Sequence, residues 1–251
     1  MLETTILAVL QGVAEFLPVS SSGHLVLGKS LLGMGNVGMR LDIFLHVGTL
    51  LAVFAFYWTV IWRIVSRHEW QYALKVVLSA VPAGIVGLTF GNGIEAAFAD
   101  PRLVGGALLF TGTVLVGTKF LPRGGKDVSY LRAILMGLAQ ALAILPGVSR
   151  SGMTLAAARA AKVEPEKSAE FSFLMSAPPI AGAALLEVLK GIGAEPVAEE
   201  VPWAVTIYGC ILASVVGYLS LKLLVKSLKG RWFWLFGVYC WLAGAVALAV
   251  S

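Results

Sequence analysis

The chain has 251 residues, of which 58% are hydrophobic and only 13% are charged. A soluble domain of this length does not need so much apolar surface, so the composition predicts a helical protein that crosses a membrane several times. Long continuous apolar runs exclude a membrane β-barrel, whose strands are short and alternate. The net charge of +5 does not indicate nucleic acid as a partner, because the basic residues stand between hydrophobic segments.

The hydrophobic segments follow one pattern twice, a pair of short pieces and then three longer runs. The first pair is 2–18 and 25–32, and the second is 134–145 and 153–161. None of these pieces is a convincing complete span of about 20 residues. The six predicted spans are 42–62, 74–91, 103–121, 170–189, 203–221 and 232–250.

A shift of 129 residues superimposes the two halves of this pattern. It places Gln11 on Gln140, Ala14 on Ala143, Val19 on Val148, Ser20 on Ser149, Ser22 on Ser151, Gly23 on Gly152, and Phe44-Leu45 on Phe173-Leu174. Each half then contains three crossings and one hairpin that enters and leaves on the same side, so the halves must have opposite orientations. We therefore predict an all-α polytopic membrane protein with two inverted-topology repeats. Each repeat is a re-entrant helical hairpin followed by three transmembrane helices, in one integral membrane domain (1–251) with halves 1–128 and 129–251.

The charges between the spans predict the orientation. Most lysines and arginines lie in the segments 63–75, 119–132, 159–167 and 222–231. The opposite side holds Lys29, Arg40, Arg102 and Lys190, with Glu95, Asp100, Glu195, Glu199 and Glu200. Basic loops stay in the cytoplasm, so both termini are predicted outside. The two hairpins then enter from opposite sides and should meet near the middle of the bilayer.

Two polar stretches, 11–24 and 146–154, interrupt the apolar sequence at the predicted hairpins. Arg150 offers a rigid fork of donors for a phosphate, and a helix that begins at glycines and serines presents free N–H groups to an anion. Glu15 can act as a base or hold a divalent cation, His24 can relay a proton, and a serine beside a base can be a nucleophile. The residues expected to meet are Glu15, Ser20, Ser21, Ser22, His24, Ser149, Arg150, Ser151 and Thr154.

Each of these residues also has a purely structural interpretation. Serines in membrane helices often cap a helix or bond to the preceding turn. Glu15 and Arg150 can be a simple ion pair, and His24 can be a packing residue. For His46 we favour a supporting role. The combination of residues, rather than any single one, indicates a phosphate or diphosphate site reached from lipid.

The two polar stretches resemble the signatures of the undecaprenyl pyrophosphate phosphatase family, also known as the bacitracin-resistance proteins. The first signature is a Glu/Gln-x-x-x-Glu pattern that runs into Phe-Leu-Pro-Val-Ser-Ser-x-Gly-His, matched by Gln11, Glu15 and the residues from Phe16 to His24. The second is Pro-Gly-x-Ser-Arg-Ser-Gly-x-Thr, matched by Pro146 to Thr154. The likeness extends over essentially the whole chain in length and in the order of the spans.

The resemblance implies hydrolysis of undecaprenyl diphosphate to the monophosphate carrier lipid, which supports peptidoglycan synthesis and confers bacitracin resistance. It implies a site in the bacterial inner membrane that opens to the periplasm and needs Mg²⁺ or Ca²⁺; a second copy of the chain is a further candidate partner. By motif position, Glu15, Ser21, His24 and Arg150 form the catalytic group. Gln11, Ser20, Ser22, Ser149, Ser151 and Thr154 are the expected substrate-binding residues.

One departure from the family pattern concerns the acidic residues. Many members carry a glutamate where this chain has Gln11, so the implied metal or base role falls on Glu15 alone. Ser21 is the preferred nucleophile with His24 assisting, and attack by an activated water is the alternative.

Other function classes also fit parts of the sequence. A carrier or flippase for a lipid phosphate shares the inverted repeat and the phosphate-binding arginine, and hydrolysis in detergent separates it from an enzyme. The phosphatidic-acid-phosphatase superfamily also has a Ser-Gly-His element, but its first and last motifs find no match here. An ion channel would need a ring of filter carbonyls, which these residues do not indicate.

Overall fold

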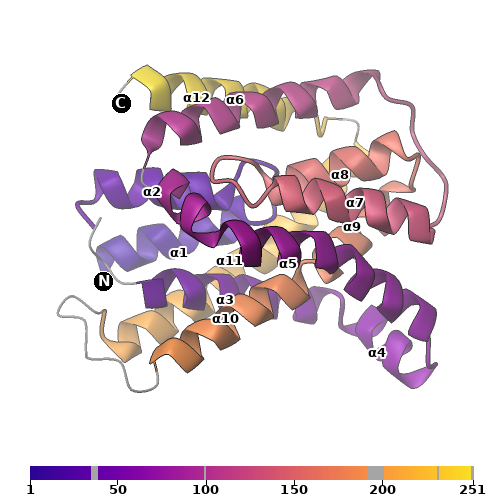
Figure 1. Ribbon diagram of the computed structural model, residues 1–251, viewed down its shortest axis with the longest axis horizontal. Coiled ribbons are helices and arrows are strands. Elements are labelled where there is room, and N and C mark those ends of the chain that lie inside the picture. The colour runs from indigo at the N-terminus through magenta and orange to yellow at the C-terminus, as the bar shows by residue number, and fades with distance from the viewer. Residues whose placement is uncertain (35–38, 99, 192–200, 231, 250–251) are drawn as a thin grey trace.

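The computed structural model describes residues 1–34, 39–98, 100–191, 201–230 and 232–249 (Figure 1). Regular structure in these residues is helical, apart from one isolated bridge between Lys126 and Val163, so the all-α class is confirmed. Of the charges used to predict orientation, Glu195, Glu199 and Glu200 lie outside the described residues, as do the side chains of Glu95 and Lys190. The helices are α1 (Leu2–Ala14), α2 (Ser21–Leu31), α3 (Met39–Phe56), α4 (Trp58–Ser66), α5 (Trp70–Phe98), α6 (Pro101–Gly117), the 3₁₀ turn η1 (Thr118–Phe120), α7 (Tyr130–Leu142), α8 (Arg150–Ala160), α9 (Pro165–Leu174), α10 (Ala177–Gly191), α11 (Trp203–Lys229) and α12 (Leu235–Ala249).

Several of these helices are suited to cross a membrane. Within the described residues, Trp70–Phe90, Pro101–Phe120 and Trp203–Lys229 are long and apolar enough to span it. The pair α3 and α4 is a fourth candidate if its two bent parts count as one span. The protein is therefore a multi-pass membrane protein, as its composition predicts.

Three of the six predicted spans differ from the helices observed. The run 42–62 bends by 68° where α3 passes into α4, so α4 leaves the direction of α3. The run 170–189 is divided between α9 and α10, because Pro178 has no N–H to continue the hydrogen bonds of α9. The run 232–250 forms α12, which has 15 residues and is shorter than a full span.

The two short pairs form helical hairpins, α1–α2 and α7–α8, whose turns lie in the middle of the molecule (Figure 1). The turns contact each other directly, since Ser151 Oγ donates a hydrogen bond to the main-chain oxygen of Leu17 at 3.3 Å. Both turns need unusual backbone conformations, with φ of +68° at Ser20 and +90° at Gly147. Glycine adopts such a φ freely, whereas Ser20 is strained and uses its side chain to accept from the Gly23 N–H.

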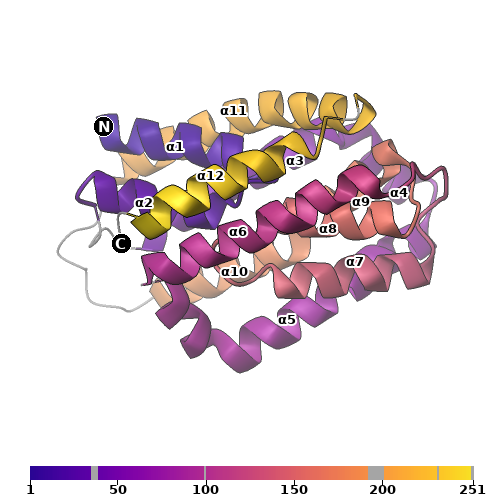
Figure 2. The ribbon, with the colours of Figure 1, turned by 90° about the horizontal axis from the view of Figure 1, so that it is seen from above.

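The helices α6 and α12 lie side by side along their length (Figures 1 and 2). Their contact is a seam of glycines, Gly105 and Gly112 on α6 against Gly237 and Gly244 on α12. A Cβ added at Gly112 would lie 2.7 Å from the Gly237 main-chain oxygen, and one added at Gly237 would lie 2.6 Å from that of Gly112. Small residues allow helix backbones to approach closely in a membrane, where packing replaces the hydrophobic effect between helices.

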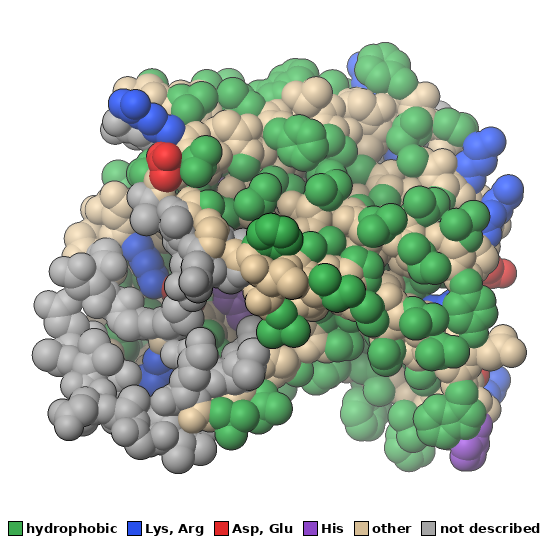
Figure 3. Space-filling view, in the orientation of Figure 1, with side chains coloured by type: hydrophobic (Ala, Val, Ile, Leu, Met, Phe, Trp, Pro, Cys, Tyr) green, Lys and Arg blue, Asp and Glu red, His purple; other side chains and the backbone are tan. Residues whose placement is uncertain are grey.

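The outer surface is apolar where lipid would surround it. Figure 3 shows hydrophobic side chains across the middle of the molecule, with Lys and Arg visible toward its ends. Helix α5 contributes strongly, because its Leu88 is 81% exposed and Ile85 is 57% exposed. Contiguous apolar surface of this extent is unfavourable in water and is typical of a lipid-facing helix.

The glycine seam can be tested with two substitutions on the same helix. Gly112→Ala should destabilise the protein by about 1–3 kcal/mol, because the new methyl group overlaps the α12 backbone. Gly106→Ala is the matched control, since a Cβ there meets nothing within 4 Å and alanine favours the helix. Thermal unfolding in detergent measures both, and equal melting temperatures would contradict close packing at Gly112.

Candidate active site

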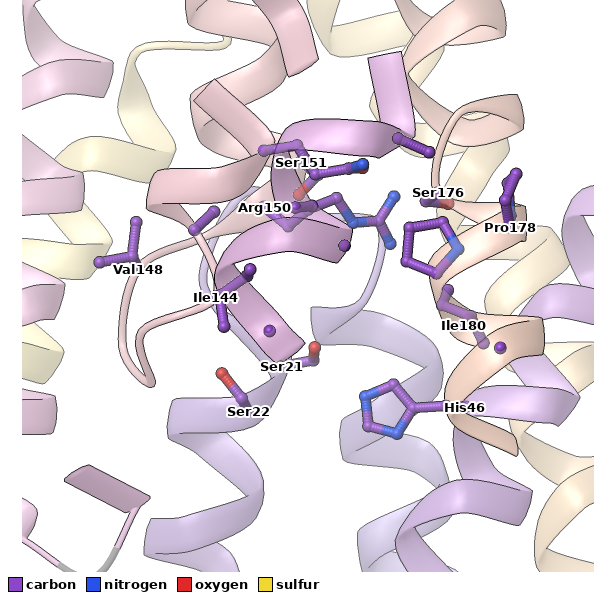
Figure 4. Close-up of a pocket in the computed structure, with 18 of the residues that line it drawn as sticks. Ser21, Ser22, His46, Ile144, Val148, Arg150, Ser151, Ser176, Pro178 and Ile180 are labelled. Atoms are coloured by element: carbon purple, nitrogen blue, oxygen red, sulfur yellow. The ribbon is translucent and has the colours of Figure 1, made fainter. Parts of the chain in front are cut away.

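A cavity of about 730 Å³ lies where the two hairpins meet. Figure 4 shows Ser21, His46 and Arg150 turned toward the same space in it, although they come from three different helices. The first hairpin contributes Ala14, Glu15, Ser20, Ser21 and Ser22 to the wall, and the second contributes Gln140, Ala143, Ile144, Val148, Ser149, Arg150 and Ser151. The cavity thus joins residues about 130 positions apart in the chain.

Two helices begin at this cavity. Helix α2 is capped by Ser20, and α8 is capped by Ser149, whose Oγ accepts from the Gly152 N–H at 3.1 Å. The first N–H groups of a helix have no partner within it, and its dipole places partial positive charge at this end. Two such ends at one cavity favour an anion there.

The Glu15 carboxylate is the centre of the polar contacts. Its Oε1 pairs with Arg150 Nη2, and its Oε2 accepts hydrogen bonds from Ser21 Oγ at 2.6 Å and Gln11 Nε2 at 3.1 Å. His46 Nε2 lies 3.8 Å from the same Oε2. The Glu15 side chain is only 6% exposed, so these partners replace the water that a carboxylate would otherwise require.

Arg150 connects the two hairpins and still has N–H groups that can donate hydrogen bonds to a ligand. Its Nη2 is used by Glu15, whereas its buried Nη1 has no hydrogen-bond partner among the described residues. The guanidinium carbon lies 5.8 Å from the centre of the Phe173 ring, which supports its position. An arginine held in this way can bind a phosphate oxygen with the unused part of its fork.

Apart from His46 and Ser176, the rest of the cavity wall is apolar. Helix α5 contributes Val77, Ala80, Val81, Ala83, Gly84, Gly87 and Leu88, and the start of α10 contributes Pro178, Pro179, Ile180 and Gly182. Leu88, which is 81% exposed, also belongs to the lipid-facing surface of α5. One cavity therefore carries both polar groups for an anion and an apolar wall that continues toward the outer surface.

Comparison with known proteins identifies the family. Residues 4–246 match the family model described as bacitracin resistance protein BacA. The chain belongs to this family. An undecaprenyl-diphosphatase of Bacteroides fragilis is 37% identical over 259 residues, which cover 99% of this chain and 97% of the relative. Proteins with the same name from Halothermothrix orenii and Methanosphaera stadtmanae are 34% and 35% identical, and each alignment covers at least 98% of this chain and 96% of the relative.

The resemblance recognised from the two polar stretches is thus confirmed, and most of the site residues predicted in those stretches meet at the cavity. Seven of the predicted site residues line the cavity: Glu15, Ser20, Ser21, Ser22, Ser149, Arg150 and Ser151. The two hairpins meet as the sequence predicted, and the Glu15–Arg150 ion pair that joins them is the contact given above as the structural interpretation of these two residues.

Three predicted site residues lie elsewhere. Gln11 is fully buried behind Glu15, and Thr154 is fully buried with its Oγ1 2.6 Å from the hydroxyl of Ser172. Neither is among the residues that line the cavity. Both are therefore supports of the site rather than parts of its wall.

His24 is also directed away from the cavity. Its Nδ1 donates to the Ser20 main-chain oxygen at 2.8 Å, and its Nε2 accepts from the Tyr239 hydroxyl at 2.7 Å. The ring stacks on that of Tyr239 on α12. Ser21, which we expected His24 to assist, donates its hydrogen bond to Glu15.

Sequence reasoning gave too little weight to His46. Its Nδ1 lies 2.8 Å from the Asp42 main-chain oxygen, which can only accept, so Nδ1 carries a proton and Nε2 faces the cavity. His46 stands in an unbroken apolar helix outside both motifs. Only its polarity within such a run was a signal of function.

The polar residues of the cavity suit a phosphate better than a divalent cation held by the protein alone. Mg²⁺ and Ca²⁺ require about six or more oxygen ligands, whereas Glu15 is the one carboxylate among the described cavity residues and already pairs with Arg150. The described residues contain no group of three or more His, Cys, Asp or Glu side chains able to hold a metal. Glu15 alone therefore does not form a complete cation site in the substrate-free protein, and the metal role expected from the sequence would need phosphate oxygens of the substrate and water as further ligands.

The Glu15–Arg150 pair can be tested by a double-mutant cycle. Arg150→Met should lower stability by about 3–5 kcal/mol, because it leaves a buried carboxylate without its partner. Adding Glu15→Gln should recover most of that loss, since no charge then remains unpaired. Thermal unfolding in detergent measures the coupling energy between the two residues. If the stability loss of the double variant equals the sum of the losses of the two single variants, the ion pair is contradicted.

Because Glu15 is the one carboxylate among the described cavity residues, we expect the substrate-free protein to bind divalent cations weakly. Millimolar Mg²⁺ or Ca²⁺ should leave its melting temperature unchanged, because Glu15 alone cannot replace the hydration shell of the ion. NaCl of equal ionic strength is the control. A rise with either divalent ion that Glu15→Gln abolishes would establish a cation site that the donor set does not predict.

Proposed function

We propose that this protein hydrolyses undecaprenyl diphosphate to undecaprenyl phosphate and inorganic phosphate. The observation that supports this most directly is the union of Arg150, Ser21 and Glu15 in one cavity with an apolar wall. The undecaprenyl-diphosphatases that align with nearly the whole chain support the same activity. In a bacterial cell this reaction would recycle the lipid carrier of peptidoglycan synthesis and confer bacitracin resistance.

The two parts of the cavity divide the substrate between them in this proposal. The diphosphate lies at the starts of α2 and α8, where Arg150 Nη1 and free N–H groups are available to its oxygens. The prenyl chain follows the apolar residues of α5 and α10 toward the lipid. Binding the head group out of water strengthens its attraction to Arg150, because the effective dielectric constant is low there.

Ser21 is the proposed nucleophile. Its Oγ attacks the terminal phosphorus, the bond from that phosphorus to the bridging oxygen breaks, and undecaprenyl phosphate leaves. Glu15 takes the proton of Ser21, to which it is already hydrogen-bonded at 2.6 Å, and passes it to the leaving phosphate. Water then attacks the phosphoserine while Glu15 accepts its proton, and the return of a proton to Ser21 Oγ releases phosphate.

His46 is the proposed neighbour of Glu15 during these transfers. Its Nε2 faces the same Oε2 that receives the Ser21 proton, and its ring is oriented by the Asp42 carbonyl. In a chain with Gln11 in place of a second carboxylate, His46 supplies the additional polar group beside Glu15.

The same proposal includes the arrangement in the membrane. We infer two inverted repeats, 1–128 and 129–251, each with a re-entrant hairpin and three membrane segments. Figure 1 supports this, because both termini lie at one end of the molecule and the two hairpins extend inward from opposite ends. The end with α4 is placed in the cytoplasm by its basic residues, and the termini and cavity opening face the periplasm of the inner membrane.

Phosphate release from undecaprenyl diphosphate by the purified protein in detergent tests this function, because no membrane is then present to be crossed. Ser21→Ala should lower kcat by at least about 1,000-fold, since it removes the attacking oxygen. Ser30→Ala, an exposed serine on the same helix, should retain the wild-type rate.

The outcomes of that assay separate the alternatives. Near wild-type turnover by Ser21→Ala would favour direct attack by water. No release by folded wild-type protein would reject the hydrolase and leave a lipid-phosphate carrier with the same binding residues.

A further inference from the structure

Gln140 lies near the end of α7 and forms part of the cavity wall. Its side chain is 4% exposed, and neither its amide nitrogen nor its amide oxygen has a hydrogen-bond partner among the described residues. Buried side-chain amides are nearly always hydrogen-bonded, because an amide without partners loses its interactions with water and regains none. An amide with both ends unbonded at a cavity indicates that a ligand supplies its partner.

Packing of the backbone, rather than hydrogen bonding of the side chain, holds Gln140 in this position. One turn earlier, a Cβ added at Gly137 would lie 2.4 Å from the Ser79 main-chain oxygen, so α7 rests directly on α5. The main-chain oxygen of Gln140 accepts from Ala143 N–H at 3.1 Å, at the end of the helix. These contacts place the side chain in the wall without using its amide.

The residue that matches Gln140 in the first half of the sequence shows what this amide can do. Gln11, 129 positions earlier, donates through Nε2 to the Glu15 carboxylate at 3.1 Å. Gln140 stands before the second polar turn as Gln11 stands before the first. Position 144, which matches Glu15, is isoleucine, so the second turn offers Gln140 no carboxylate.

We propose that Gln140 is a substrate-binding residue whose Nε2 donates a hydrogen bond to a phosphate oxygen of the prenyl diphosphate. The phosphate oxygen takes the place that the Glu15 carboxylate has beside Gln11. The inference rests on the proposed function for the identity of the ligand. It adds a neutral donor from the second hairpin to the charge of Arg150, so that both groups contact the head rather than the prenyl chain.

Binding of a non-hydrolysable ligand tests this contact without requiring turnover. The full-length protein in detergent is compared with Gln140→Met, which keeps the shape of the side chain and removes its amide, and with Gln71→Met, an exposed control at the start of α5. The probes are a methylene-bridged prenyl diphosphate analogue, the corresponding prenyl alcohol and inorganic phosphate. The readouts are the melting temperature and the Kd of each probe.

Gln140→Met should bind the diphosphate analogue about 10- to 100-fold more weakly than wild type, which is the usual loss for a hydrogen bond to a charged group. Its affinity for the prenyl alcohol should not change, because the alcohol has no phosphate. Without ligand, its melting temperature should equal or exceed that of wild type, since no unbonded amide remains buried. A parallel loss of inorganic phosphate binding would place the contact on the terminal phosphate.

Three results would overturn the proposal. Equal affinity of wild type and Gln140→Met for the analogue would exclude the contact, even if the protein is a hydrolase. A melting temperature several degrees below wild type without ligand would show that the amide is bonded within the protein. If wild type binds neither the analogue nor phosphate, the proposed function itself fails and the Gln140 contact fails with it.

Discussion

The ion pair between Glu15 and Arg150 is the interaction on which the centre of this molecule depends. A carboxylate that is 6% exposed cannot remain charged at membrane depth without a partner, and its partner comes from the other half of the chain. The pair therefore determines how the two hairpins meet. Because Ser21 also bonds to Glu15, the same interaction that joins the hairpins places the hydroxyl beside the arginine.

The two turns around this pair create a site for an anion without interrupting the other helices of the fold. Each hairpin ends one short helix and begins another, so α2 and α8 both present their first N–H groups to the cavity. Non-helical backbone is tolerated at this depth because protein surrounds it, and Ser20 and Ser149 each accept from one N–H in the first turn of the helix that follows. The breaks in the helices and the binding site are thus one structural feature.

The surrounding helices keep this centre rigid while leaving it open to lipid. The glycine seam between α6 and α12 brings two backbones into contact, as expected where helices associate by packing in a membrane. Helix α5, in contrast, exposes much of its apolar surface and also lines the cavity. A lipid with a charged head and a long apolar chain can therefore contact both environments at once.

The sequence by itself determined the helical membrane class, the two polar turns and the family, because apolar run lengths and continuous motifs are local properties. It also indicated that Glu15 and Arg150 should meet, since each belongs to one of two hairpins that were predicted to enter the membrane from opposite sides. Only the tertiary structure decided that His46 faces the cavity, that His24 turns to Tyr239 and that the side-chain amide of Gln140 has no hydrogen-bond partner among the described residues. Those outcomes depend on the rotation and packing of whole helices, which neighbouring residues in the chain do not specify.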